Sequence, residues 1–189
     1  IKGMDGSSED VPSSVFDSAV TAEEEGFESI MKGEGGENPY VVHDEMGDAM
    51  LLDVTVERFN AKMQEVDSRI DGWMERARRV TIHDRERPVN QMAFFVRHLR
   101  GMIDLARVIV RGAILRDESR GSHFKPDFPE RNDEKWLKTT VARHSGSGPV
   151  FEYEPVDVSI VAPRKRSYVE AGAASAAAKG QKVGKGAAG

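Results

Sequence analysis

Residues 90–115, NQMAFFVRHLRGMIDLARVIVRGAIL, are the stretch that decides the fold class. Their apolar side chains recur at steps of three and four, which places them on one face of a long helix. The pattern predicts a helix from about residue 90 to residue 120. The residues of that face are Phe95, Leu99, Met102, Ile103, Ala106, Ile109, Val110, Ala113 and Ile114.

Two further helices are predicted before this one. Asn38 followed by Pro39 is a suitable start, because asparagine caps helices and proline is favoured at the first helical position. The helical period then runs to Phe59, and it continues from Met63 to Ala77 on the next stretch. Three amphipathic helices with short connections predict an antiparallel three-helix bundle, similar to a spectrin repeat, over residues 38–121. The remaining apolar positions of the first two helices are Val42, Met46, Ala49, Leu52, Val56, Val66, Ile70, Trp73 and Met74.

The segments around the bundle differ from it in composition. Residues 1–37 form an acidic helical lead-in, with nine acidic and two basic residues in the first 36. Residues 122–168 are rich in proline, and residues 150–154 and 156–161 alternate as short strands do. Residues 169–189 are mostly Ala, Gly and Lys, so we expect a disordered tail. The predicted fold class is therefore mainly α: a three-helix bundle followed by an extended C-terminal arm with short β-strands.

Composition narrows the possible functions. The chain has 189 residues, 39% of them hydrophobic and 31% charged, and no cysteine. It therefore carries no disulfide, no thiolate nucleophile and no cysteine-ligated metal centre of its own. The basic residues of the tail are sparse and have no aromatic residues between them, which favours a solvated terminus over a nucleic-acid partner. Because the chain begins with Ile1, we expect it to be a piece of a longer protein.

No set of residues looks catalytic. His43 and His83 each have carboxylates nearby, but neither lies at helical spacing from a second histidine, so a solvated polar surface is the better interpretation. The glycines of residues 33–36 do not follow a strand and match no phosphate-binding loop. We predict no catalytic, cofactor-binding or metal-binding residue in this chain.

Residues 116–137, RDESRGSHFKPDFPERNDEKWL, are the most specific motif. Gly121 is suited to the left-handed conformation that follows a helix. Glu118 and Arg120 are too polar for a bundle core, and with His123 and Asp127 they would suit a surface that docks through charge-assisted hydrogen bonds. The alternative is an exposed charged cap.

This motif resembles the C-terminal region of succinate dehydrogenase and fumarate reductase flavoprotein subunits. The resemblance rests on residues 118–123, 127–131, 133–134 and 136–137, with Ser122 where the family usually has alanine. The segments 153–156 and 163–168 also resemble that family's terminal arm. The resemblance implies a helical domain that docks onto the rest of the subunit. The domain-docking residues would be Glu118, Ser119, Arg120, Gly121, His123, Asp127 and Arg131.

The resemblance also implies partners outside this chain. FAD would be bound by an upstream domain, with a capping domain beside it, and this piece would hold none of the catalytic groups. An iron–sulfur subunit would receive the electrons, and a membrane anchor subunit would take part indirectly. We therefore expect a cytoplasmic protein, peripheral on the inner face of the membrane, without a nucleic-acid partner. Two alternatives stay open: the C-terminal domain of L-aspartate oxidase, which shares the motif's core, and a free-standing helical binding module.

Overall fold

The structure is a computed structural model that describes residues 10–164. These residues fall into two units, one ending at Glu154 and one beginning at Pro155. The prediction of a mainly α fold is confirmed. The predicted disordered tail lies outside the described residues.

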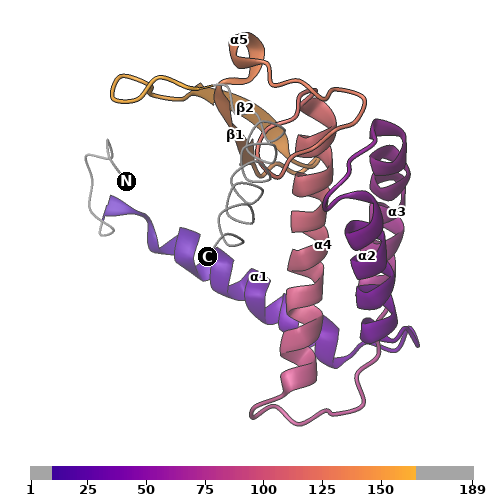
Figure 1. Cartoon of the computed structure of the whole chain (residues 1–189). Helices are drawn as coiled ribbons and strands as arrows, with labels where there is room; N and C mark the ends of the chain where they lie inside the picture. The colour runs from indigo at the N-terminus through magenta and orange to yellow at the C-terminus, as the bar shows by residue number, and fades with distance from the viewer. Residues whose placement is uncertain (1–9, 165–189) are drawn as a thin grey trace, which may run out of the picture. The chain divides into compact units, whose positions relative to one another are not determined.

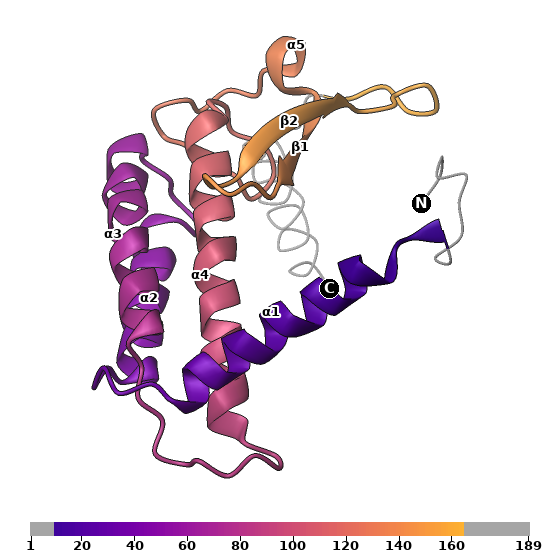
Figure 2. The ribbon, with the colours of Figure 1, turned by 180° about the vertical axis from the view of Figure 1, so that it is seen from behind.

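Three helices form the bundle, and a fourth crosses it. Figures 1 and 2 show α2 and α3 together on one side of α4, while α1 crosses α4 from the other side. Two short elements follow α4: the single-turn helix α5 and a hairpin of β1 and β2, which are hydrogen-bonded to each other. The bounds are α1 Ser13–Met31, α2 Pro39–Asp53, α3 Asn60–Arg78, α4 Gln91–Leu115, α5 Asp133–Trp136, β1 Lys138–Arg143 and β2 Val150–Pro155.

Two apolar clusters hold these elements together. The larger one lies between α2, α3 and α4 and includes Met63, Ile70, Leu99 and Ile103, all fully buried. In the smaller cluster, the C-terminal end of α1 packs against the first turns of α4 and against residues 80–82. Its members are Ile30, Met31, Val80, Ile82, Ala93 and Val96. Val80 and Ile82 belong to the connection between α3 and α4, which thus supplies part of the core.

The predicted helix ends need correction. The helix that begins at Pro39 stops at Asp53, so Leu52 and Val56 are not core residues and are 75% and 71% exposed. Its chain turns there so that Val54 points inward and is buried. The helix that begins at Gln91 ends at Leu115 rather than near residue 120, because Arg116 takes an extended conformation. Ile109 is exposed as well.

The lead-in and the arm also differ in detail from the prediction. Within the lead-in, Ser13–Met31 form one continuous helix, α1, whose residues 13–25 are all exposed. The predicted strand at 150–154 is confirmed as β2, but its partner β1 was not predicted, and residues 156–161 form no strand. The sequence of β1, KTTVAR, lacks the alternation of apolar residues that would have revealed it.

The glycine-rich stretch 33–36 is explained by close packing. A Cβ atom on Gly33 would lie 2.2 Å from the carbonyl oxygen of Val80, and one on Gly35 would lie 2.2 Å from that of Arg79. The backbone of Glu37 forms a bridge with Val80 at the same place. These glycines therefore allow two connections to lie against each other.

Val89 precedes the start of α4 in an unfavourable conformation. Its φ is +56°, and its side chain is exposed, so no packing depends on it. A β-branched residue in the left-handed region costs on the order of 1–3 kcal/mol. We expect Val89→Gly to raise the free energy of unfolding by about 1 kcal/mol, after the greater flexibility of glycine in the unfolded chain is included.

Thermal unfolding would test this expectation. The matched control is Val56→Gly, at another exposed valine but outside the left-handed region, which should lower the midpoint or leave it unchanged. Equal effects of the two substitutions would contradict the strain at Val89.

Candidate functional site

The residues of the predicted docking motif gather beyond the C-terminal end of α4, around one buried carboxylate. Glu118 is 0% exposed. One of its oxygens accepts hydrogen bonds from Arg116 and from Nε of Arg120 at 2.9 Å. The other accepts from Arg120 and from the backbone N–H of Asn132, both at 3.0 Å. Burial alone would raise the pKa of Glu118, but these hydrogen bonds outweigh it and hold the pKa below its ordinary value.

Arg116 links this carboxylate to the following segments. Its guanidinium donates to the carbonyl oxygens of Trp136 and Lys138 and to the hydroxyl of Thr140, at 3.2 Å for the hydroxyl. Its charge also lies 5.2 Å from the centre of the Trp136 ring. Arg116 therefore ties the end of α4 to α5 and β1.

A second layer of charges lies outside the first. The Arg120 guanidinium donates to Asp133 at 2.6 Å, and Arg131 donates to the other oxygen of Asp133 at 2.7 Å. The Glu118 and Asp133 carboxylates together raise the pKa of Arg120. Charge therefore alternates across the whole cluster, from Arg116 to Glu118, Arg120, Asp133 and Arg131.

Ser119 and Gly121 shape the turn between these groups. The Ser119 hydroxyl accepts from the backbone N–H of Lys125 at 2.9 Å and contacts the carbonyl oxygen of Phe128 as donor at 2.9 Å. Arg120 and His123 exchange backbone hydrogen bonds across Gly121, whose φ is +61°. The left-handed conformation expected of Gly121 is present, but in this turn rather than at the end of the helix.

A buried lysine covers the end of α4. The Lys125 side chain is fully buried, and its ammonium donates to the carbonyl oxygen of Ile114 and to Asp117, both at 2.9 Å. Burial lowers the pKa of Lys125, and the Asp117 carboxylate opposes that effect. The cation thus satisfies a free carbonyl in the last turn of the helix, where positive charge is favoured.

His123 joins this cluster to the connection between α2 and α3. Its Nδ1 lies 2.6 Å from a guanidinium nitrogen of Arg58, and its Nε2 lies 2.9 Å from the carbonyl oxygen of Arg116. Because Arg58 can only donate and the carbonyl can only accept, the ring is neutral, with its proton on Nε2. Burial lowers the pKa of His123, and the nearby charges of Arg58, Lys125 and Arg116 add to that effect.

Thus most of the predicted docking residues are bonded within the described chain. Asp127, Gly121 and the rings of Phe124 and Phe128 remain exposed. Trp136 is buried, unlike these rings, and it packs edge-on against Tyr153 with ring centres 5.4 Å apart. The predicted docking residues did not include Arg58, Arg116, Asp117 and Lys125. Arg58 lies 65 residues from His123, so no local pattern could have revealed their contact.

Most charged groups of this cluster are paired with one another. Its arginines and carboxylates neutralise one another, and the His123 ring already uses both nitrogens. Across residues 10–164, no group of three or more potential metal ligands occurs, and none of the helices is long and apolar enough to cross a membrane. Gly33 and Gly35 follow a helix and pack against neighbouring backbone, so this glycine-rich stretch does not form a dinucleotide-binding loop.

The neutral His123 predicts a specific response to acid. Its folded-state pKa lies below the ordinary 6.5, so the unfolded chain binds the proton more readily. We expect the free energy of unfolding to fall as the pH decreases from about 7 through the lowered pKa. Denaturant unfolding between pH 5 and 8 would measure this slope. His123→Gln keeps a donor and an acceptor but cannot titrate, so a slope that persists unchanged in this variant would contradict the assignment.

Comparison with known proteins identifies the family. Residues 43–168 match the family described as fumarate reductase flavoprotein C-term. The chain is 49% identical over 170 residues to the succinate dehydrogenase flavoprotein subunit of Bacillus subtilis, covering 89% of this chain and 29% of the relative. It is 36% identical to the fumarate reductase flavoprotein subunit of Haemophilus influenzae, covering 92% of this chain and 30% of the relative.

A solved structure supports the same relationship. A mutant form of Escherichia coli quinol fumarate reductase matches with a TM-score of 0.76 and 27% identity, over 82% of this chain and 27% of that one. The chain thus spans less than a third of the length of the relatives it matches. It belongs to the family of C-terminal domains of succinate dehydrogenase and fumarate reductase flavoprotein subunits.

Proposed function

We propose that this domain braces the upstream part of a flavoprotein subunit that binds FAD and interconverts succinate and fumarate. The electrons would pass to an iron–sulfur subunit within a complex on the cytoplasmic face of the membrane, with an anchor subunit as an indirect partner. The first support is the family membership. The second is that the match covers only 29% and 30% of the length of the two relatives, so most of each relative lies outside the matched region.

The observation that carries the bracing role is the buried Glu118 carboxylate with its four hydrogen bonds. A charge with no exposure and four donors holds the backbone of residues 116–133 in one conformation. That conformation leaves Phe124, Asp127 and Phe128 on the outside. We therefore assign the predicted docking residues to two layers: Glu118, Ser119, Arg120, Gly121, His123 and Arg131 shape the segment, and Asp127 contacts the upstream domains together with the two rings.

The same contacts argue against a direct part in the reaction. Oxidation of succinate needs a hydride acceptor and a proton acceptor on opposite sides of the substrate. Neither Arg116 nor Arg120 is available to bind a dicarboxylate without first giving up Glu118. The reaction is therefore assigned to the upstream part, and the role of this domain is to hold that part in place.

Loss of Arg120 should affect assembly rather than substrate affinity. In the full-length subunit, Arg120→Ala leaves the buried Glu118 with fewer partners, and breaking such a pair costs about 3–5 kcal/mol. We expect a lower unfolding temperature and a reduced flavin content, with an unchanged KM for succinate in the protein that still assembles. Arg143→Ala is the control, because the exposed Arg143–Glu152 pair is worth less than about 1 kcal/mol. Normal flavin content and stability in the Arg120 variant would contradict the bracing role.

The exposed rings test the outer layer separately. Phe124→Ser together with Phe128→Ser should leave the cluster around Glu118 intact but remove apolar contact with the upstream domains. In the full-length subunit we expect faster amide hydrogen exchange in residues 120–131 and faster loss of flavin on dilution. Leu51→Ser with Leu52→Ser is the matched control, since both leucines are exposed on α2. Equal behaviour of the two double variants would exclude these rings as the contact.

A further inference from the structure

The helix α1 has an apolar stripe that is only partly covered. At its C-terminal end Ile30 and Met31 are buried, and Phe27 is half-buried against the small core cluster. On the same helical face, about two and three turns before Phe27, Val20 and Phe16 are 56% and 52% exposed. The stripe thus extends past the part of α1 that packs against the rest of this domain.

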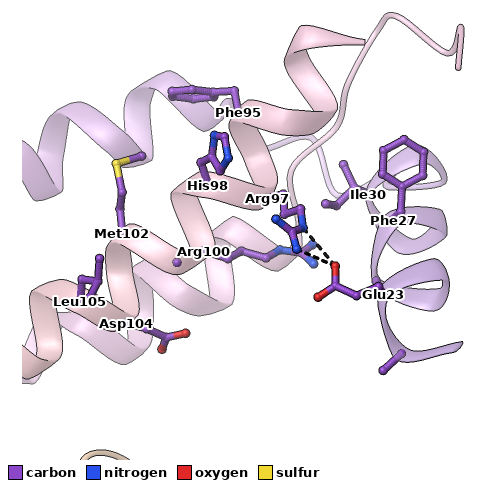
Figure 3. A pocket seen from close by; sticks show the side chains of 13 residues that line it. Glu23, Phe27, Ile30, Phe95, Arg97, His98, Arg100, Met102, Asp104 and Leu105 are labelled. Atoms are coloured by element: carbon purple, nitrogen blue, oxygen red, sulfur yellow. Dashed lines mark hydrogen bonds and ion pairs between the residues drawn. The ribbon is translucent and has the colours of Figure 1, made fainter. Parts of the chain in front are cut away.

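The exposed part of the stripe leads into a groove between α1 and α4. The groove has a volume of about 920 Å³, and its α4 wall combines apolar side chains with the charged side chains of Arg97, Arg100 and Asp104. Figure 3 shows Glu23 facing Arg97 across it, with two hydrogen bonds of 2.7 and 3.1 Å, while Phe27 and Ile30 lie on the same helix as Glu23. The side chains of the α4 wall include Phe95, His98, Met102 and Leu105.

An isolated helical end of this kind needs a partner. Residues 13–25 are all exposed, and helices of about that length are marginal in water without tertiary packing. Five acidic and no basic residues within α1 add repulsion. Phe16 and Val20 would therefore gain most from being covered by an apolar surface.

We infer that this groove and the exposed stripe of α1 dock the polypeptide that precedes this domain in the parent subunit. The inference rests on the proposed function. Relatives more than three times longer than the matched region supply a large preceding part, and α1 is the first helix of the chain and so the nearest element to it. Asp17 and Glu24 lie beside the stripe, so the docked segment is apolar with at least one basic residue at its edge.

This docking surface is separate from the segment around Glu118. Gly101 lines the groove, and Arg116 begins the charged cluster at the other end of α4. Fifteen residues of helix at 1.5 Å each separate them by roughly 22 Å. The preceding part would thus be held at two places along one rigid helix, which fixes its orientation as well as its position.

Substitution on α1 in the full-length subunit tests the inference. Val20→Glu places a charge in the stripe, and the matched control Thr21→Glu places the same charge one residue away, about 100° around the helix and outside the stripe. We expect hydrogen exchange in residues 13–27 to be slow in the wild type and in the control, and at least tenfold faster in Val20→Glu. Flavin content and light scattering would be measured on the same three samples.

Each result has a defined meaning. Fast exchange of residues 13–27 in the wild type, with flavin bound, would overturn the inference that the groove is a docking surface. It would leave the proposed function intact. Absence of flavin from the full-length protein would overturn the proposed function itself. Slow exchange only at concentrations where light scattering shows a dimer would assign the groove to a second copy and overturn the inference. Slow exchange in a monomer, lost only in Val20→Glu, supports it.

Discussion

The organisation of this domain beyond its bundle depends on a single desolvated carboxylate. Glu118 could not be buried without its partners, since removing a charge from water costs several kcal/mol. Its partners come from three places along the chain: Arg116 at the end of α4, Arg120 in the turn and the backbone of Asn132 before α5. A segment with little regular structure, which contains two prolines and one glycine, thereby acquires a defined shape without a hydrophobic core of its own.

The bundle was predictable because the residue patterns that specify its helices are local in the sequence. The buried residues of α4 recur at helical steps, and Asn38 caps α2 through its side chain as its position next to Pro39 suggested. Exact ends were less predictable, because they depend on distant contacts. α4 stops at Leu115 since Arg116 must turn its guanidinium towards Trp136 and Lys138, twenty and twenty-two residues away along the chain. Leu52 and Val56 continue the helical period by sequence, but Leu52 is on the exposed face of α2 and Val56 lies beyond its end.

The location of the candidate site was predictable from the sequence, but its hydrogen bonds and ion pairs were not. The density of charge in residues 116–137 and the family resemblance both drew attention to it. Which groups are buried could not be inferred, because an alternation of Arg, Asp, Glu and Lys looks the same whether it is solvated or paired. Lys125 is the clearest case: its burial follows from the meeting of Ile114 and Asp117 around it, and neither contact has a signature in sequence. β1 was missed for a similar reason, since its side chains are mostly polar and its pairing depends on the hairpin.

The buried position of Lys125 and Glu118 has a consequence for behaviour in salt. Mobile ions screen charges that solvent reaches, with a Debye length of about 8 Å at physiological ionic strength, but they do not enter a site with no exposed surface. The pairs around Glu118 and Lys125 therefore keep their strength in concentrated salt. The link between α1 and α4 through Glu23 and Arg97 lies in solvent and weakens as ions are added. The two ends of α4 thus respond differently to ionic strength. Added salt weakens the ion pair that links α1 to α4, while the charged segment beyond the C-terminal end of α4 keeps its shape.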